Sequence, residues 1–402
     1  MNNDQKQESS KKRGVDQTSF LPQVRSLLFL VVIFFINYIA RVILAPLMPA
    51  IEVDLGVWHK EAGSFFFLLS MGYCLMMLLS GFISSRLNHK KTIILSSTAA
   101  GIALMMIGLS PHLWEIRFWL FILGMAAGLY LPSGIATLMG LVSSEHLGKA
   151  VAIHELAPSL GGVVAPLLVE VLLGLWSWRG ILILLGVISI LVGVLFAFFG
   201  KGGGFSGEAP SFRTLRNISV EPSFWIMMIL FALGIGSSFG VYSMLPLYLV
   251  SERGMERTWA NTLLALSRVS TPVIVLLSGW VTDRLGVKKT LKAVFFGTGL
   301  VTALLSVVPG SWIILIIFLQ PMFSHSFFPA GFAALSRMGS PNIRKVSVSL
   351  TIPISSLLGS GAIPAGIGFI GEVGSFSIGF TLLGVSILVG AILVRYLKFD
   401  DH

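Results

Sequence analysis

Long apolar segments separated by short polar loops dominate the chain. An α-helix rises about 1.5 Å per residue and the hydrocarbon core of a bilayer is about 30 Å thick, so a spanning helix needs roughly 20 apolar residues. Strands of a membrane barrel would be about ten residues long and would alternate in polarity. The pattern therefore predicts an all-α polytopic membrane protein. Its twelve expected spans are 26–51, 63–85, 92–110, 115–141, 148–174, 180–200, 222–250, 258–281, 291–308, 311–336, 346–370 and 374–396.

Composition supports a membrane protein and excludes several other classes. Of the 402 residues, 55% are hydrophobic and 11% are charged, whereas an ordinary soluble domain is about a quarter charged. This excludes a soluble globular, a disordered and a fibrous protein. Cys74 is the one cysteine, so no internal disulfide and no multi-cysteine metal site can form. We expect no metal and no cofactor.

Positive charges are spread over short loops rather than gathered in one patch, which argues against a nucleic-acid partner despite the formal charge of +10. With the loops assigned to alternate sides, 21 of the 28 Lys and Arg residues lie on the side shared by both termini and four on the other. The three that remain, Arg41, Arg117 and Arg268, fall within spans. By the positive-inside rule, both termini are expected in the cytosol of a protein in the cytoplasmic (inner) membrane.

The two halves of the chain resemble each other at a shift of 198 residues. Gly81, Arg86 and Lys90 then coincide with Gly279, Arg284 and Lys288. The shift covers six spans, an even number, so the halves keep one orientation and form a parallel repeat. The predicted organisation is a disordered cytosolic tail (1–25), a six-helix half (26–200), a cytosolic linker (201–221) and a second six-helix half (222–398).

The loops after spans 2 and 8 carry the repeat in its most specific form. They read GFISSRLNHKK from Gly81 and GWVTDRLGVKK from Gly279. Each resembles the loop G-x-x-x-D-R-x-G-x-K-K of the major facilitator superfamily of secondary transporters, and two copies at this spacing in a twelve-span chain make the resemblance specific. It covers about residues 26–398. It implies alternating access between two halves that this loop latches together on the cytosolic side.

The two copies of the loop differ at two positions. The second has Asp283, Arg284, Gly286 and Lys288, as the superfamily pattern requires. In the first, Ser85 replaces the acid and Asn88 replaces the glycine, and Asn tolerates the left-handed turn that glycine favours. The latch around span 2 is therefore expected to be weaker, or to use another acid. The superfamily's fourth-span arginine is also displaced, so the resemblance assigns no coupling role to Arg117.

Charges inside the membrane are functional candidates because they are expensive to bury. Arg41 and Arg268 should lie near mid-bilayer depth, one in each half, and two guanidinium groups can bind an anion through charge-assisted hydrogen bonds. Alternatively, each arginine pairs with a neighbouring carbonyl or Glu and only holds helices together. His325 is a candidate substrate donor or proton relay, or else a helix–helix hydrogen bond. Tyr38 is a candidate cavity residue, with packing as the alternative.

Span 5 holds the candidates for proton coupling. Glu155 should lie about 9 Å into the helix from Lys149, where a carboxyl in a dry site can carry a proton; a salt bridge at the cytosolic gate is the alternative. His154 lies beside it. A zinc site is excluded because Pro158 stands where a second histidine would be needed. Glu170 is expected to be a solvated residue at the periplasmic rim.

These features favour a secondary active transporter of a small organic anion, coupled to protons or another ion. The alternative is proton-coupled efflux of lipophilic or cationic drugs, although no Asp falls in any expected span. A non-transporting membrane receptor is a distant alternative. The chain has no nucleophile–base pair and no nucleotide loop, so an enzyme is not expected. The expected partners are the substrate, the coupling ion and the lipid bilayer, with the protein as a monomer.

Overall fold

The computed structural model describes residues 20–143, 145–207, 221–338 and 341–397, and in these ranges the regular secondary structure is helical. Twelve helical segments of the described chain are long and apolar enough to cross a membrane. Their bounds agree with the predicted spans to within a few residues at each end. The expectation of an all-α polytopic membrane protein is therefore confirmed. Residues 1–19 of the predicted tail and most of the linker lie outside the described residues. The rest of the tail, residues 20–25, was predicted to be disordered but forms the start of a helix.

The first six spans are built from eight helices, because spans 1 and 4 are each interrupted once. These helices are α2 (Phe20–Val42), α3 (Leu44–Leu55), α4 (His59–Leu87), α5 (His89–Leu109), α6 (Leu113–Gly128), α7 (Tyr130–Leu141), α8 (Leu147–Leu173) and α9 (Trp178–Phe199).

The last six spans are interrupted more often. Their elements are α11 (Pro222–Ile235), the π-helix η1 (Gly236–Gly240), α12 (Val241–Ser251), α13 (Arg257–Arg268), α14 (Thr271–Leu285), α15 (Val287–Val307), α16 (Trp312–His325), α17 (Phe327–Leu335), α18 (Pro341–Ser356), the π-helix η2 (Leu357–Ala362), α19 (Ile363–Val373), α20 (Phe376–Leu393) and the 3₁₀-helix η3 (Val394–Tyr396).

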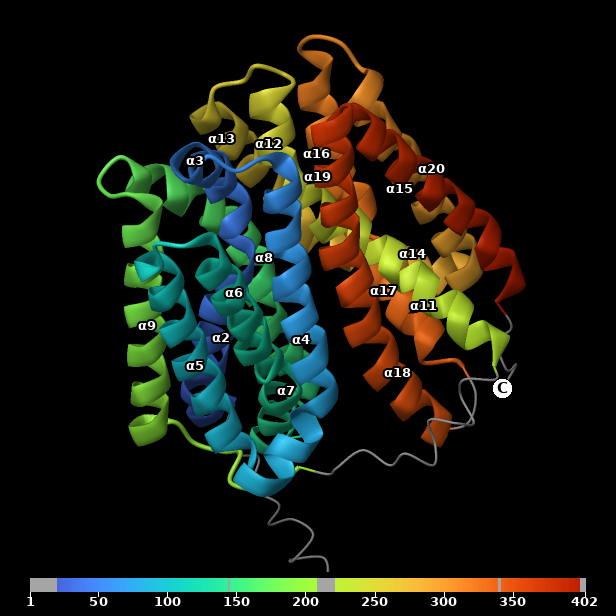
Figure 1. Cartoon of the computed structure of the whole chain (residues 1–402). Helices are drawn as coiled ribbons and strands as arrows, with labels where there is room; N and C mark the ends of the chain where they lie inside the picture. Colours follow the sequence, from blue (N-terminus) through green and yellow to red (C-terminus); the bar gives the residue numbers. More distant parts are fainter. Residues whose placement is uncertain (1–19, 144, 208–220, 339–340, 398–402) are drawn as a thin grey trace, which may run out of the picture.

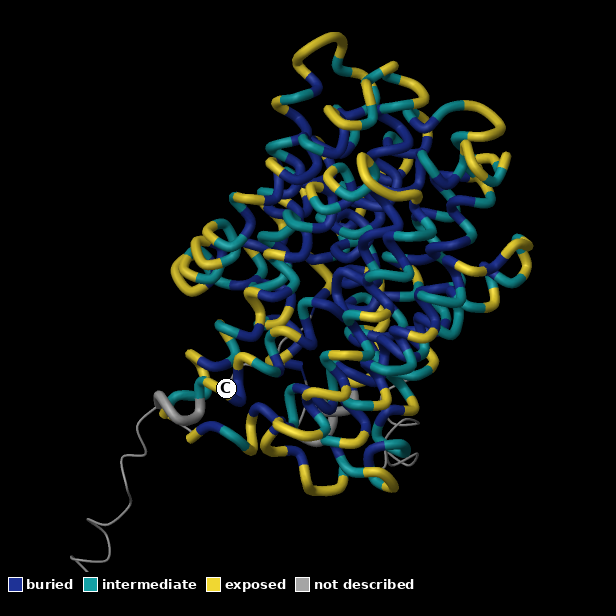
Figure 2. The backbone as a smooth tube through the Cα atoms, turned by 90° about the vertical axis from the view of Figure 1, so that its left-hand side faces the viewer, coloured by how far each residue is buried: buried dark blue, intermediate teal, exposed yellow. Residues whose placement is uncertain are grey.

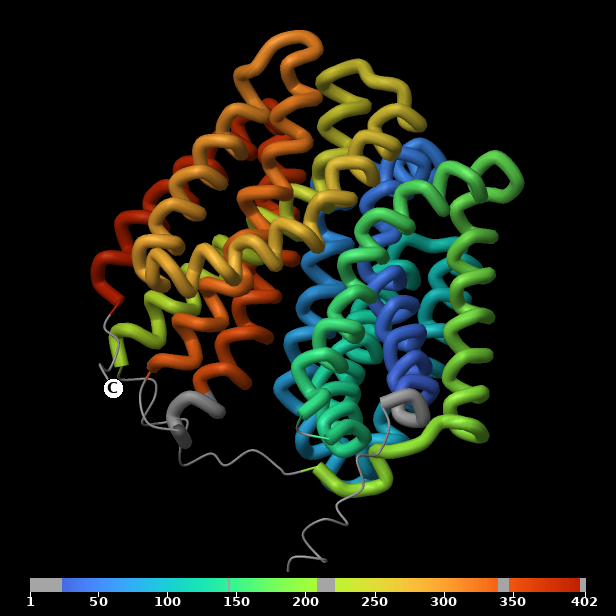
Figure 3. The backbone as a smooth tube through the Cα atoms, turned by 180° about the vertical axis from the view of Figure 1, so that it is seen from behind, coloured from blue at the N-terminus to red at the C-terminus, as the bar shows by residue number. Residues whose placement is uncertain are grey.

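The helices form two groups, α2 to α9 and α11 to α20, that lie side by side (Figure 1). The groups approach each other at the upper end, where α3 is joined to α4 and α8 to α9, and diverge toward the lower end, where α4 is joined to α5 (Figures 1 and 3). Ser70 of α4 and Ser360 of η2 join the groups through a hydroxyl hydrogen bond of 3.1 Å.

Two helix pairs show the same contact in the two groups. Gly101 of α5 packs against Gly186 of α9, and a Cβ on either would lie 2.5 Å from the other's carbonyl oxygen. Gly299 of α15 packs against Gly384 of α20 in the same way, at 2.8 Å. Each pair requires glycine because the backbones meet directly. Each residue of the second pair follows its counterpart by 198 positions, which supports the predicted repeat and its parallel orientation.

Burial follows the pattern expected of a bundle in lipid (Figure 2). The middle of the bundle is filled by large apolar side chains such as Tyr130, Tyr248 and Phe231, each at most 1% exposed. Large apolar side chains also cover the outside, for example Leu276 at 74% and Phe198 at 78% exposed. So much exposed apolar surface is unfavourable in water and suits a hydrocarbon environment.

Breaks in the helices of the second group lie close to its functional candidates. The π-helix η1 interrupts span 7 at Ser238, span 8 breaks directly after Arg268, and span 10 breaks at Ser326, directly after His325. A break or π-turn releases backbone carbonyls from the regular helical pattern and makes them available as hydrogen-bond acceptors. These interruptions therefore position polar groups inside an apolar bundle.

Candidate substrate site

Arg268 is held inside the second group of helices by three polar partners. The residue is 5% exposed. Its Nη2 donates to the carbonyl oxygen of Ser238 at 3.1 Å, and its Nη1 lies 3.2 Å from Nε2 of His325. The guanidinium carbon also lies 4.8 Å from the centre of the Tyr242 ring, a cation–π distance. None of these partners carries a negative charge.

His325 acts as a neutral acceptor toward Arg268. Its Nδ1 lies 3.0 Å from the carbonyl oxygen of Pro321, one turn earlier in α16. A carbonyl oxygen only accepts, so Nδ1 carries the hydrogen and Nε2 has a free lone pair. That lone pair faces Arg268 and also the Ser238 hydroxyl at 3.2 Å. The structure thus places His325 in a helix–helix hydrogen bond beside the arginine.

Arg41 lies in the last turn of α2 and is surrounded by aromatic rings. Its guanidinium carbon is 4.5 Å from the ring centre of Tyr73 and 5.5 Å from that of Tyr38. Tyr38 is 7% exposed and meets Phe239 of η1 edge-on, with ring centres 5.9 Å apart. Tyr38 therefore lies between Arg41, over its ring, and η1, the element whose Ser238 carbonyl accepts from Arg268.

Several polar atoms at this place have no hydrogen-bond partner among the described residues. They are Nε of Arg41, Nε of Arg268 and the hydroxyl of Tyr242, all buried. Leaving a buried donor unpaired costs about 1–3 kcal/mol. The ion pairs found in the described chain involve neither arginine. The site thus combines two positive charges with unused donors, which an anionic ligand would satisfy.

The structure gives the two span-5 candidates different surroundings. His154 is fully buried among Phe34 and Tyr130, whereas the side chain of Glu155 is 51% exposed. Of the two alternatives for Glu155, a carboxyl in a dry site does not agree with this exposure. Glu155 follows directly after His154, so the α-helix turns its side chain about 100° away from the buried face.

Glu170 is not the solvated rim residue that was expected. Its side chain is 12% exposed and accepts hydrogen bonds from Arg257 Nε at 3.2 Å, Thr258 Oγ1 at 3.0 Å and Asn261 Nδ2 at 2.5 Å. Asn261 also donates to the carbonyl of Pro46 at 3.1 Å. These four side chains, the Glu170 cluster, join α8 to α13 at the upper end. The three donors come from the other half of the chain, so no local pattern reveals them.

The two copies of the repeated loop adopt the same turn. Asn88 has φ 70° and Gly286 has φ 82°, so Asn takes the left-handed place of the glycine as expected, and among the described residues it is the one non-glycine with positive φ. Asn88 Oδ1 then caps α5 by accepting from Lys91 N at 3.0 Å. Asp283 is exposed, and Arg284 lies over the Trp280 ring at 4.3 Å.

The linker contacts the first copy of this loop. The backbone N–H groups of His89 and Lys90 donate to the carbonyls of Phe205 and Gly203, at 3.2 and 2.7 Å. The Lys90 ammonium donates to the carbonyl of Gly200 at 2.8 Å. Residues 200–205 therefore satisfy the first N–H groups of α5, which an α-helix leaves unpaired.

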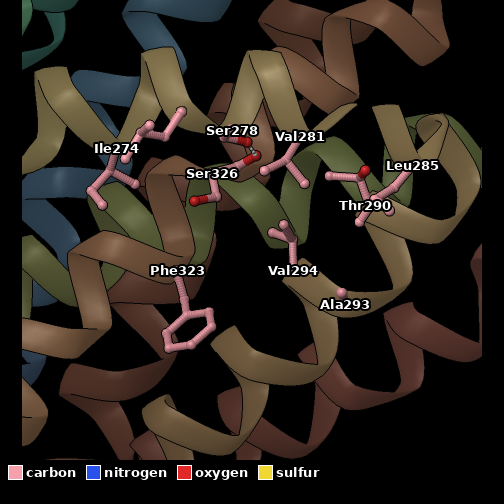
Figure 4. A pocket seen from close by; sticks show the side chains of 10 residues that line it. Ile274, Ser278, Val281, Leu285, Thr290, Ala293, Val294, Phe323 and Ser326 are labelled. Carbon is pink, nitrogen blue, oxygen red and sulfur yellow. Dashed lines mark hydrogen bonds between the residues drawn. The ribbon is translucent and has the colours of Figure 1, made fainter. Parts of the chain in front are cut away.

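A pocket of about 220 Å³ lies apart from the arginines, between α14, α15 and α16 (Figure 4). Apolar side chains such as Ile274, Val281 and Phe323 line most of it. Ser278 donates to the carbonyl of Ser326 at 2.7 Å across the pocket wall. The lining contains no charged side chain, so this pocket is not a site for an ionic substrate.

Comparison with known proteins shows the family. The profile of the Major Facilitator Superfamily matches residues 30–274, and the chain belongs to that family. The expected membership is thereby confirmed.

Among curated relatives, the probable sulfoacetate transporter of Cupriavidus necator is 28% identical over 168 residues, which are 42% of this chain and 39% of that protein. The matched segment thus spans well under half of that relative. The cis,cis-muconate transport protein of Acinetobacter baylyi is 23% identical over 377 residues, 88% of this chain and 89% of that protein.

Among solved structures, a bacterial homologue of the human lysosomal transporter Spinster, in an inward-facing and occupied conformation, matches with a TM-score of 0.77 and 15% identity. The match covers 92% of this chain and 96% of that one. At this identity the likeness concerns the fold alone.

Proposed function

We propose that this protein is a secondary active transporter that moves a small organic anion across the cytoplasmic membrane by alternating access. One observation carries the proposal: among the described residues, Arg41 and Arg268 have no carboxylate partner, and buried polar atoms beside them have no hydrogen-bond partner. A charge in such a place is expensive unless a counter-charge arrives. An anionic substrate provides that counter-charge, and the guanidinium fork suits carboxylate and sulfonate oxygens.

The curated relatives support the same substrate class. The printed names of two of them contain sulfoacetate and cis,cis-muconate, which are small organic anions. We therefore favour substrates with carboxylate or sulfonate groups. The Tyr38, Tyr73 and Tyr242 rings around the arginines form an aromatic wall against which a short carbon skeleton can pack.

We infer that the conformation described here is inward-facing. The Glu170 cluster joins the two groups at the upper end, and the helices diverge toward the lower end, where α4 is joined to α5 (Figures 1 and 3). This junction carries Arg86, Lys90 and Lys91. The positive-inside rule assigns that lower end, with both termini, to the cytosol. Single cysteines at positions 88 and 286, in a Cys74-free background, should be labelled only from the cytosolic side. Labelling from the periplasm would reverse this orientation.

A ligand screen tests the substrate class. Purified protein is heated with small carboxylates, sulfonates and phosphates and, in a parallel series, with cationic drugs. A ligand that binds the native state and not the unfolded state raises the melting temperature, and the increase grows with its concentration relative to Kd. We expect stabilisation by one or more of the anions and its loss in Arg268→Ala protein. Stabilisation by cations alone would overturn the proposal in favour of drug efflux.

A further inference from the structure

Both ring nitrogens of His154 make hydrogen bonds, although the residue is fully buried. Nε2 lies 3.0 Å from the hydroxyl of Tyr130, and Nδ1 lies 3.3 Å from Oε1 of Glu155. The Tyr130 hydroxyl in turn donates to the carbonyl of Leu30 at 2.7 Å. The chain of contacts thus runs from a half-exposed carboxyl, through an imidazole and a phenol, to the backbone of α2.

Counting hydrogens along this chain leads to a protonation state. Tyr130 has one hydroxyl hydrogen. The Leu30 carbonyl can only accept, so this hydrogen is donated to it, and the Tyr130 oxygen must in turn accept a hydrogen bond from Nε2–H of His154. With Nε2 protonated, a neutral His154 has a bare Nδ1. A bare nitrogen facing a carboxylate would be repulsive, so the contact at 3.3 Å needs one further proton, on Nδ1 or on Glu155.

We infer that His154 and Glu155 together bind one exchangeable proton, and that Tyr130 makes this proton necessary by fixing His154 as the Nε2–H tautomer. Tyr130 is a positioning residue, because it sets the state of the imidazole and does not itself exchange the proton. The exposed carboxyl of Glu155 gives the proton a route to solvent. On release, the proton leaves from this carboxyl to water, and the Nδ1–Oε1 contact is lost.

The surroundings contain few other groups that could hold this proton. Among the described residues, Tyr130 and Glu155 are the titratable groups in contact with His154. From α2, the pair meets the Phe34 ring, which stacks on the imidazole with ring centres 4.4 Å apart. Lys149, the nearest basic residue on α8, is exposed.

This pair is connected to the arginine site by the packing of α2 on α8. Leu30, Phe34 and Tyr38 follow one another at intervals of one helical turn along α2. Tyr38 packs directly on Gly161 of α8, where a Cβ would lie 2.5 Å from the ring. If α8 moves when the pair loses its proton, the Tyr38 ring that packs on it would therefore have to move as well, next to Arg41. A role in ion coupling rests on the proposed function; proton binding itself does not.

The test is a proton titration of purified protein without substrate. Difference titrations against wild type locate the steps lost in Glu155→Gln and in His154→Gln. Each single variant removes one of the two proton-binding groups, and the double variant removes both. A shared proton predicts that the two groups are coupled, so that the proton uptake lost in the two single variants does not add up to the loss in the double variant. Tyr130→Phe frees His154 to carry its hydrogen on Nδ1, so this coupling should become weaker in the Tyr130→Phe background.

Tyr248→Phe is the matched control. The Tyr248 hydroxyl also donates to a buried carbonyl, that of Leu305 at 2.6 Å, but it contacts no histidine. Its removal should leave the coupling between His154 and Glu155 unchanged. Additive losses of proton uptake in the two span-5 variants, or undiminished coupling in Tyr130→Phe, would overturn the inference. Because no substrate is used, a failure of the anion screen above leaves this outcome unaffected. If Tyr130→Phe does not fold, the Glu155→Gln and His154→Gln variants and their double variant still test whether the proton is shared.

Discussion

Arg268 donates toward Nε2 of His325 at 3.2 Å, although both side chains are cationic when protonated. The contact exists because the Pro321 carbonyl accepts a hydrogen bond from Nδ1–H of His325, which leaves Nε2 without a hydrogen and able to accept. The guanidinium is thus oriented without being neutralised, and its charge stays available to a ligand. A carboxylate in the place of His325 would have cancelled that charge.

The first prediction concerns Arg268. Arg268→Ala should weaken anion binding by about 2–5 kcal/mol, because it removes one side of a desolvated charge contact. Arg268→Lys should also bind poorly, since an ammonium group cannot reproduce the planar guanidinium fork. Isothermal titration with the best anion of the screen measures both. Arg117→Lys is the control and should retain wild-type affinity. Unchanged affinity in Arg268→Ala protein that folds would make this arginine a structural residue.

The Tyr242→Phe variant should lower anion affinity without lowering the melting temperature of the free protein. The Tyr242 hydroxyl is buried and has no hydrogen-bond partner in the described chain, so its removal should not lower the melting temperature of the free protein. If the hydroxyl bonds the substrate, anion affinity should fall by about 1 kcal/mol, or roughly fivefold. Thermal unfolding and ligand titration of one preparation give both values. A lower melting temperature with normal affinity would contradict the expectation.

Glu170→Gln should weaken the contact between α8 and α13 at the upper end of the bundle. It removes the charge that Arg257 pairs with and weakens the acceptor shared by Thr258 and Asn261. The equilibrium should then shift away from the conformation described here, because the Glu170 cluster joins the two groups. Distance measurements between spin labels on the upper ends of α8 and α13 would detect longer separations. Glu256→Gln, an exposed acid next to Arg257, is the control and should leave the distances unchanged.

The repeated loops should differ in their importance. Asp283 is exposed in this structure, so we propose that it forms a latch in the opposite conformation of the transport cycle. Ser85 carries no charge, and it donates to the carbonyl of Phe82, in its own helix, at 2.9 Å. Asp283→Asn should therefore slow uptake into proteoliposomes, and Ser85→Ala should have little effect. Equal rates for the two variants would contradict the proposed asymmetry of the latch.

The paired glycines give a prediction about stability. Gly101→Ala and Gly299→Ala should each destabilise the fold by about 1–3 kcal/mol, because the new methyl group would overlap the backbone of the facing helix. Gly366→Ala should be neutral or stabilising, because nothing lies within 4 Å of a Cβ there. Melting temperatures rank the three variants. Similar losses at positions 101 and 299 would support the repeat, and a loss at only one of them would count against it.

Much of the fold could be predicted from the sequence, because lipid imposes a simple rule on it. Every span must be apolar for about 20 residues, so helices such as Val24–Leu55 are visible as segments before any packing is known. The repeated loops at Gly81 and Gly279 could be found for a related reason. Their turn is local, and it restricts the residue types at Asn88 and Gly286 to those that accept positive φ.

The embedded arginines could be recognised from the sequence as functional candidates, because any charge within an apolar span needs an explanation. Their partners could not be recognised. Ser238 and Pro321 contribute carbonyls, which every residue has, and the carbonyl of Ser238 faces Arg268 only because η1 interrupts the helix. The contact of Tyr38 with Phe239 of η1 likewise depends on how the two groups of helices meet.

Burial of the carboxylates was decided by tertiary structure alone. Glu155 and Glu170 lie on one helix, α8. Glu155, for which a dry site was one alternative, is half exposed, whereas Glu170, expected to be solvated, is largely covered by Arg257, Thr258 and Asn261. Depth along a helix follows from counting residues at about 1.5 Å each. Exposure depends on which helix faces each side of it, and for α8 that neighbour is α13, about 90 residues further along the chain. Residue order determined the spans and their charges, whereas long-range packing determined which charges meet.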